Sequence, residues 1–211
     1  MLTCFFMKQQ EAPRYGGISQ LLHWVTAVLV VYAFSNGLGG SEARVYLPSR
    51  DFQRHLHETV GLCLLALVVI RLLWRTVETR PEPVEAVPWM HTARTAVEVA
   101  LYVLLFAVPL TAVFGAWLEG HPLTLLGGSS IPVLPIVSHD AGATLSRLHT
   151  WLGDAIIWVG VFHALAALYH HFILKDTALI SMLPAWLPVH QLSFVKRRRA
   201  NPNTNSFRVS K

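Results

Sequence analysis

Four histidines stand inside or at the ends of long apolar stretches, where an ionisable side chain is costly and therefore indicates function. They are His23, His57, His149 and His163. His149 and His163 share one stretch and are 14 residues apart. On a helix, this spacing places two residues within about 40° of the same face and about 21 Å apart along the axis. One helix would therefore present two imidazoles at two depths.

The other two histidines match these depths. His57 begins an apolar stretch that starts on the same side as His149, whereas His23 lies in the opposite half, together with His163. Two opposed neutral imidazoles at one depth are what a six-coordinate b-type haem requires. A macrocycle also needs small neighbours, which the sequence supplies one turn from three of these histidines, at Gly61, Gly153 and Gly160.

Two other interpretations of these residues stay open. In the first, the histidines and glycines only bond and pack helices together, as small and polar residues commonly do in membranes. In the second, the histidines line the path of a divalent-metal transporter. A transporter would also need carboxylates in the middle of the membrane, but Glu58 and Glu98 lie near the ends of apolar stretches, and the deepest acid is Asp154.

The composition predicts the elements that position these residues. Of the 211 residues, 53% are hydrophobic and 14% are charged, against about 25% charged in soluble domains. Four apolar runs cover residues 18–38, 57–74, 93–118 and 145–172, each near or above the length of about 20 residues that spans a bilayer. The sequence excludes a soluble globular protein and predicts an all-α fold, a four-helix transmembrane bundle. The second run ends in arginines, Arg71 and Arg75, which we expect to extend to the lipid headgroups.

The basic residues predict the orientation of this bundle. Thirteen of the 17 Lys and Arg residues fall on the side of the two termini, and four fall on the opposite side. The positive-inside rule then places both termini in the cytoplasm. We divide the chain into an N-terminal cytoplasmic segment 1–17, a four-span domain 18–176 and a basic cytoplasmic tail 177–211, with residues 119–144 as an external loop. Met1 and Met7 both fit a translation start.

The same tail bears on the partners of the protein. Six basic residues follow the last span, where they can lie against anionic lipid headgroups, so membrane lipid rather than nucleic acid is the expected partner. They are Lys196, Arg197, Arg198, Arg199, Arg208 and Lys211. Cys4 and Cys63 have no pairing pattern, so neither a disulfide nor a thiolate metal site is predicted.

Four stretches together resemble a known family: RYGGISQLLHW (14–24), HETVGLCLLALVVIRLLWR (57–75), LYVLLFAVPLTAVFG (101–115) and LHTWLGDAIIWVGVFHALAALYHHFILKD (148–176). They are similar to the bacterial diheme cytochrome b561 proteins, whose domain is shared with the cytochrome b subunits of nickel hydrogenases. The resemblance implies a multi-pass protein of the bacterial inner (cytoplasmic) membrane. It also implies two haem b groups with bis-histidine ligation, on His23, His57, His149 and His163, in agreement with the depths.

His55 precedes His57 by two residues and could be confused with it as a ligand. A separation of about 200° around a helix prevents both from facing one haem. We prefer His57 because the spacing to Gly61 belongs to it, and we expect His55 to be an external polar residue near the haem edge.

Histidine at both axial positions leaves no vacant site on the iron and limits its chemistry to outer-sphere electron transfer. We therefore expect an electron carrier between a periplasmic partner and the quinone pool, with ubiquinone as the redox partner that the family implies. His170, His171 and Lys175 are candidate quinone contacts at the cytoplasmic end. The alternative is that these three residues only anchor the helix at the headgroups.

The external end carries cationic and imidazole side chains that could attract an anion, namely Arg44, Arg50, Arg54, Arg147, His55 and His139. Superoxide is such an anion, and some relatives of the family resemble superoxide:quinone oxidoreductases, so a superoxide oxidase is one alternative function. A cytochrome b subunit that docks a dehydrogenase or hydrogenase is another. Ordinary solvated loops would carry the same charges.

Overall fold

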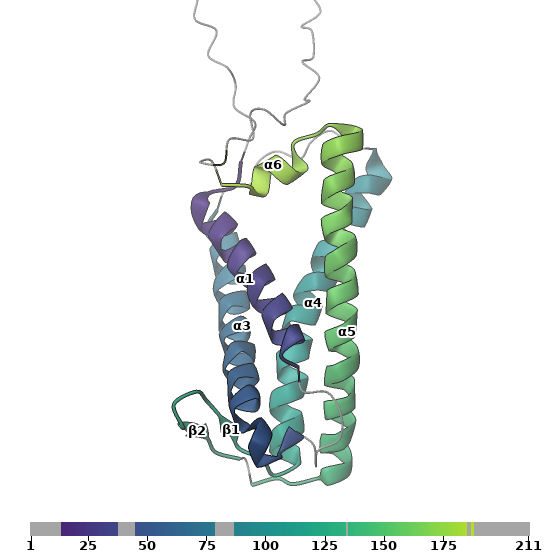
Figure 1. Ribbon diagram of the computed structural model, residues 1–211. Helices are drawn as coiled ribbons and strands as arrows, with labels where there is room; N and C mark the ends of the chain where they lie inside the picture. The colour runs from purple at the N-terminus through teal and green to yellow at the C-terminus, as the bar shows by residue number, and fades with distance from the viewer. Residues whose placement is uncertain (1–13, 38–44, 79–86, 134, 185–186, 188–211) are drawn as a thin grey trace, which may run out of the picture.

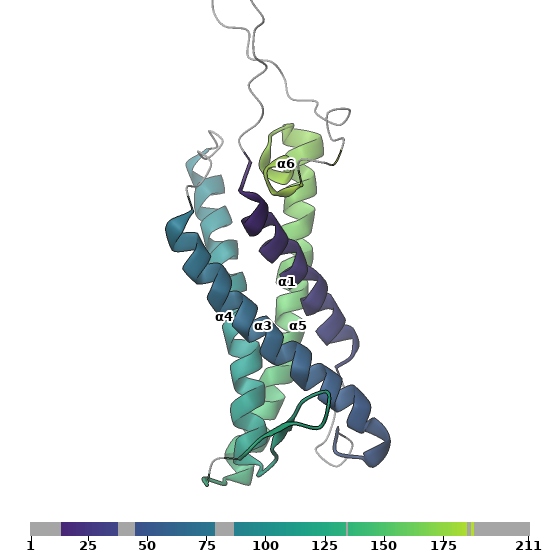
Figure 2. The ribbon, with the colours of Figure 1, turned by 90° about the vertical axis from the view of Figure 1, so that its left-hand side faces the viewer.

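The four predicted spans are present as four long helices. The computed structural model describes residues 14–37, 45–78, 87–133, 135–184 and 187. Its long helices are α1 (Gly17–Ser35), α3 (Asp51–Val77), α4 (Pro88–Leu118) and α5 (His139–Tyr169). They run between the same two ends of the molecule (Figures 1 and 2), and all four are long and apolar enough to cross a membrane. The prediction of an all-α four-span bundle is confirmed.

Short elements complete the two ends of the bundle. One end holds the 3-10 turn η1 (Pro48–Arg50) and an antiparallel hairpin of β1 (Leu123–Thr124) and β2 (Ser130–Ile131). The other end holds the π-helical turn η2 (His170–Leu174) and helix α6 (Ala178–Met182). Figure 1 shows the hairpin and α6 at opposite ends. We call the hairpin end the outer end and the α6 end the inner end.

Close packing between α4 and α5 depends on two glycines near the outer end. A Cβ atom on Gly142 would lie 2.5 Å from Cγ and 2.9 Å from the backbone nitrogen of Glu119. A Cβ atom on Gly115 would lie 3.1 Å from Oγ of Ser146. Glycine at these two positions therefore allows the backbones to approach, as small residues commonly do between membrane helices.

The buried core lies at the middle of the bundle. It consists of Val68 from α3, Leu105 from α4 and Ile156 from α5, against which Val30 from α1 packs. Ile156 is seven residues from both His149 and His163. An apolar layer therefore separates the levels of those two histidines.

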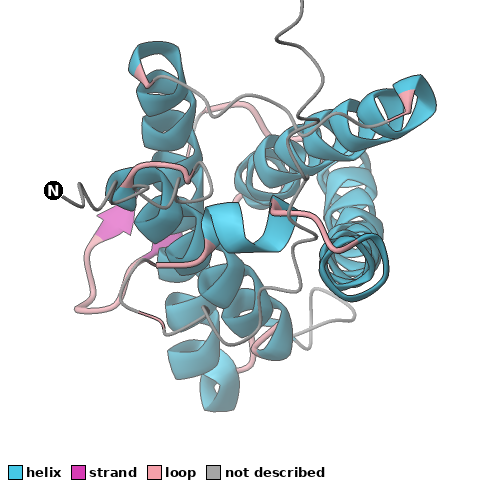
Figure 3. Cartoon of the chain, turned by 90° about the horizontal axis from the view of Figure 1, so that it is seen from above, coloured by secondary structure: helices cyan, strands magenta, loops and turns pink. Residues whose placement is uncertain are grey.

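Helix α6 joins the start of α1 to the end of α5. The Tyr15 backbone N–H donates to the Ser181 carbonyl at 3.0 Å, and Nε1 of Trp24 donates to the Met182 carbonyl at 2.9 Å. Seen from above, α6 lies across the inner end of the bundle (Figure 3). Both ends of the described chain are therefore at the inner end.

The structure corrects the boundaries expected for two helices and one loop. Helix α3 begins at Asp51 and α5 at His139, six residues before the expected positions 57 and 145. Both helices begin with a polar turn that hydropathy does not detect, and each first turn contains an acid, Asp51 or Asp140, which favours a helix N-terminus. The expected loop 119–144 contains the hairpin and the first turns of α5.

Some sequence predictions concern residues outside the described part of the chain. They are the two translation starts Met1 and Met7, Cys4, Arg44, the six basic residues of the tail, and Lys8 and Arg80, which are two more of the thirteen basic residues counted on the side of the termini.

Candidate haem sites

The structure brings two histidines together near the outer end, one from α3 and one from α5. The ring centroids of His57 and His149 are 6.0 Å apart and their planes are at 87° to one another. Bonds of about 2 Å between imidazole nitrogens and one metal ion place the centroids of two opposed rings about 6 Å apart. The outer pair therefore has the spacing of two axial ligands of one iron.

Backbone carbonyl groups fix which nitrogen of each outer ring is free to bind a metal ion. Nδ1 of His57 lies 3.0 Å from the Ala33 carbonyl oxygen, and Nδ1 of His149 lies 2.8 Å from that of Val108. A carbonyl can only accept, so both Nδ1 atoms must donate, and the lone pair of each ring is on Nε2. Metal-binding histidines commonly use this arrangement, which orients the ring and increases its basicity.

A second pair lies toward the inner end. The ring centroids of His23 from α1 and His163 from α5 are 6.4 Å apart, and their planes are at 67° to one another. The two pairs are those that the depth argument predicts. Their role as haem ligands stays a prediction.

The inner pair has a different neighbour from the outer pair. Nη2 of Arg71 lies 3.2 Å from Nδ1 of His23, and Cζ of Arg71 lies 5.5 Å from the centroid of the Tyr102 ring. Our expectation that Arg71 extends to the headgroups is wrong. The imidazole and the aromatic ring give the guanidinium favourable partners inside the bundle. The sequence does hold a signal for this, since Arg71 follows His57 by 14 residues, as His163 follows His149.

Glycines near the histidines leave space beside them. A Cβ atom built on Gly61, Gly153 or Gly160 would meet no atom within 4 Å, although each of these glycines is half-buried. They differ in this from Gly115 and Gly142, which bring α4 and α5 into contact. Together with the ring spacing and the free Nε2 lone pairs of the outer pair, this space fits a flat macrocycle held by two imidazoles.

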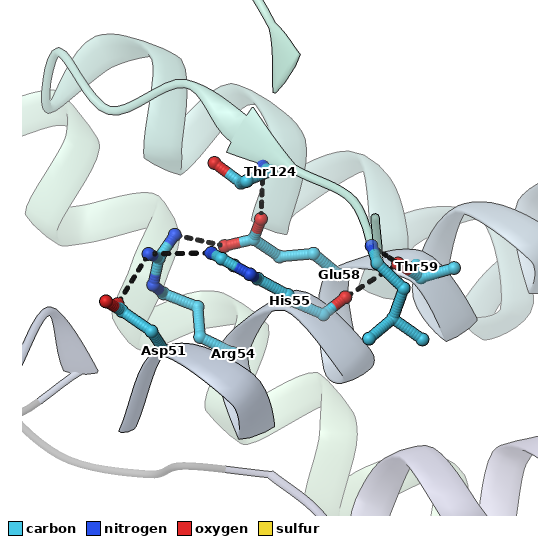
Figure 4. A network of polar contacts seen from close by, with 7 residues as sticks. Asp51, Arg54, His55, Glu58, Thr59 and Thr124 are labelled. Atoms are coloured by element: carbon cyan, nitrogen blue, oxygen red, sulfur yellow. Dashed lines mark hydrogen bonds and ion pairs between the residues drawn. The ribbon is translucent and has the colours of Figure 1, made fainter. Parts of the chain in front are cut away.

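A polar cluster on the first turns of α3 holds the hairpin (Figure 4). Oε2 of Glu58 accepts the Thr124 backbone N–H at 2.6 Å, and Oγ1 of Thr59 accepts that of Leu126 at 2.9 Å. Sequence reasoning missed this contact, because a hairpin of two-residue strands has no hydrophobic pattern to reveal it.

The same cluster reduces the positive charge expected at the outer end. Arg54 pairs with Asp51 at 2.8 Å and with Glu58 at 3.3 Å. His55 lies beside this arginine, with Nε2 3.2 Å from Nη2 of Arg54. Two carboxylates therefore compensate one of the cations that we considered for anion attraction. Of the others, Arg50 contacts Gln53, Arg147 contacts Thr144, and His139 begins α5.

The three quinone candidates lie at the inner end in different environments. Nδ1 of His170 lies 2.5 Å from Oδ2 of Asp176, so this imidazole already has a partner. The residue His171 is 4% exposed, and its Nδ1 has no hydrogen-bond partner among the described residues. Lys175 adopts a left-handed backbone conformation, with φ of 56°, just after η2.

The alternative of a metal-transport path gains no support from these contacts. Within the described ranges, no group of three or more His, Cys, Asp or Glu side chains is arranged to hold a metal ion.

Comparison with known proteins identifies the family of this chain. The sequence pattern of the prokaryotic cytochrome b561 family matches residues 14–185, which include all four spans and both histidine pairs. The chain belongs to the prokaryotic cytochrome b561 family. Cytochromes of this family are membrane proteins that carry b-type haem, so the protein is a bacterial integral membrane haem protein.

This cytochrome b561 chain aligns with nearly the whole length of several individual relatives. Cytochrome b561 homolog 2 of Escherichia coli (strain K12) is 34% identical over 174 residues, which are 81% of this chain and 91% of the relative. Cytochrome b561 homolog 1 of the same organism is 27% identical, with coverage of 81% and 97%. A Yersinia pestis protein named probable superoxide oxidase CybB is 28% identical, with coverage of 81% and 96%.

Proposed function

We propose that the protein binds two b haems, one at each histidine pair, and carries electrons across the bacterial inner membrane between a periplasmic partner and the quinone pool. The observation that carries this proposal is that two pairs of imidazoles lie at two levels of one bundle. The ring centroids are 6.0 Å apart in the outer pair and 6.4 Å apart in the inner pair. Helix α5 contributes one histidine to each level, so the two sites are joined through a single rigid element.

The residues of the chain would hold the haems and restrict their chemistry. His57 and His149 would ligate the outer haem through Nε2, oriented by the Ala33 and Val108 carbonyl groups. His23 and His163 would ligate the inner haem. With both axial positions filled, the iron supplies one-electron transfer rather than binding of oxygen.

Ubiquinone is the proposed partner at the inner end, where His171 supports a contact. A buried imidazole nitrogen without a partner is unfavourable, and a quinone carbonyl or quinol hydroxyl would satisfy His171 in either ring tautomer. Among the three candidates, His171 therefore fits this role better than His170, which is paired with Asp176.

The first experiment is a pyridine haemochrome assay on the detergent-purified protein. Wild-type protein is expected to give two b haems per chain. Changing either histidine of one pair to alanine should leave one haem per chain, whereas His55→Ala, two residues before His57 on the same helix, should retain both. A well-folded wild-type protein without haem would contradict the proposal.

Superoxide oxidation is a second candidate, supported by the similarity to the Yersinia pestis protein. Each superoxide would give one electron to the protein and leave as O2, and two electrons with two protons would convert one ubiquinone to ubiquinol. Rapid reduction of the haem bands by superoxide, followed by reoxidation with ubiquinone, is the expected result. Failure of superoxide to reduce the protein would remove this candidate and leave the electron-transfer proposal standing.

A further inference from the structure

Arg71 is placed to act on one histidine pair only. It stands 14 residues after His57 on α3, which corresponds to about 21 Å along a helix and nearly the same face. Helix α3 thus contributes a ligand candidate at the outer level and a guanidinium at the inner level. That guanidinium contacts His23, and its charge also acts on His163, as does the opposite charge of Glu98, which pairs with Arg75.

Arg71 forms no ion pair with a carboxylate of the described residues, in contrast to the next arginine on the same face. Arg75, one turn further along α3, forms an ion pair with Glu98. Both guanidinium groups lie over the ring of Tyr102, so the two arginines differ mainly in whether a negative charge is beside them.

The two histidine pairs therefore have different electrostatic surroundings. At the outer pair, carbonyl oxygens accept from both Nδ1 atoms, which makes the imidazoles more basic and stabilises the oxidised iron. At the inner pair, a permanent positive charge lies beside the ligand candidates. Positive charge in a medium of low dielectric disfavours the oxidised state, which carries one more positive charge than the reduced state.

We propose that Arg71 sets the reduction potential of the inner haem above that of the outer haem, so that an electron entering at the outer pair settles at the inner pair. This inference rests on the proposed two-haem function. Arg71 would act on the inner haem through its charge and would not be a ligand of the iron. In the present contact Nδ1 of His23 accepts from Arg71, so its proton is on Nε2. Iron binding at Nε2 would move that proton to Nδ1 and break this hydrogen bond, but the charge of Arg71 would remain at the level of the inner pair, because its helix position is fixed.

The test is a potentiometric titration of the purified two-haem protein, followed by visible spectra. The titration should show two one-electron steps, one for each haem, which we call the outer and the inner step. His149→Met identifies the outer step, since a Met/His ligand pair raises the potential of that haem. Arg71→Gln should lower the potential of the inner step and leave the outer step nearly unchanged. We expect the equilibrium distribution of one electron between the two haems to shift by about tenfold or more, equivalent to about 59 mV for a one-electron couple.

Two further variants separate charge from shape. Arg71→Lys keeps the charge and should keep the inner potential close to that of the wild type. The double variant R75Q/E98Q removes an ion pair over the same Tyr102 ring without changing net charge, and its inner potential should shift much less than that of Arg71→Gln.

Clear results would overturn the inference. The inference is wrong if the inner haem of the wild type has a potential equal to or below that of the outer haem. This outcome decides the question even if Arg71→Gln loses its haem. The inference is also wrong if the potential of the inner step is unchanged in a haem-loaded Arg71→Gln protein. In both cases two haems per chain would leave the proposed function intact, whereas absence of haem from folded wild-type protein would contradict the proposed function itself.

Discussion

Gly153 and Gly142 lie on the same helix but serve different purposes. A Cβ atom at Gly142 would collide with the backbone of Glu119, whereas one at Gly153 would meet nothing within 4 Å. The glycine at position 142 is explained by helix contact alone. The glycine at position 153, one turn after His149, has open space beside it, and we propose that a macrocycle fills this space.

Substitution of these two glycines should separate haem binding from folding. Gly153→Leu would place a side chain beside the outer pair, so we expect loss of one haem per chain in a protein that still folds in detergent. Gly142→Ala should retain both haems in the protein that folds but lower its stability by about 1–3 kcal/mol, because of overpacking. Full haem content in Gly153→Leu would argue that helix packing alone explains these glycines.

At the scale of elements, the hairpin is attached to α3 by a charged acceptor. Hydrogen bonds to charged groups contribute about 1.5–3 kcal/mol, and Glu58→Ala would remove the acceptor of the Thr124 N–H. We expect the free energy of unfolding to fall by about that amount, with faster amide hydrogen exchange confined to residues 123–131. Asp51→Asn is the matched control, because this exposed partner of Arg54 contributes less than about 1 kcal/mol. Equal effects of the two variants would contradict the role of Glu58.

Helix α6 gives a second prediction at this scale. The two carboxylate oxygens of Asp176 contact Nδ1 of His170 and the Ala178 backbone N–H at the start of α6. A hydrogen bond to a charged group contributes about 1.5–3 kcal/mol, so Asp176→Ala should loosen α6 beside the proposed quinone contact. We expect a higher KM for ubiquinone in stopped-flow reoxidation of the reduced protein. Ser181→Ala keeps the backbone carbonyl that accepts from Tyr15 and should behave as wild type.

The elements themselves were largely predictable from the sequence, and their polar contacts were not. Apolar runs of membrane-spanning length identify helices because every backbone group in lipid must be paired within the chain. The same signal stops at polar residues, so the first turns of α3 and α5 were missed. The sequence gives the depth of Arg71 along its helix, but the direction of its side chain depends on Tyr102 and His23, which come from other helices.

For the molecule as a whole, the joined ends of the described chain make a topological prediction. The Tyr15 to Ser181 hydrogen bond puts both ends at the inner end, and the positive-inside rule assigns that end to the cytoplasm. A fluorescent protein fused after residue 211 should therefore fluoresce, and alkaline phosphatase at that position should be inactive. Alkaline phosphatase inserted between residues 127 and 128, in the hairpin turn, should be active. The opposite pattern would reverse the direction of the proposed electron path.

The apolar layer of Val68, Leu105 and Ile156 has a consequence for the energetics of the membrane. Electrons can tunnel through such a layer, but protons need polar groups or water to cross it. Turnover between the two sites would then move net charge and act on the membrane voltage. Moving one elementary charge across 100 mV involves about 2.3 kcal/mol, so inward electron flow would be slowed by an interior-negative voltage and would itself increase that voltage.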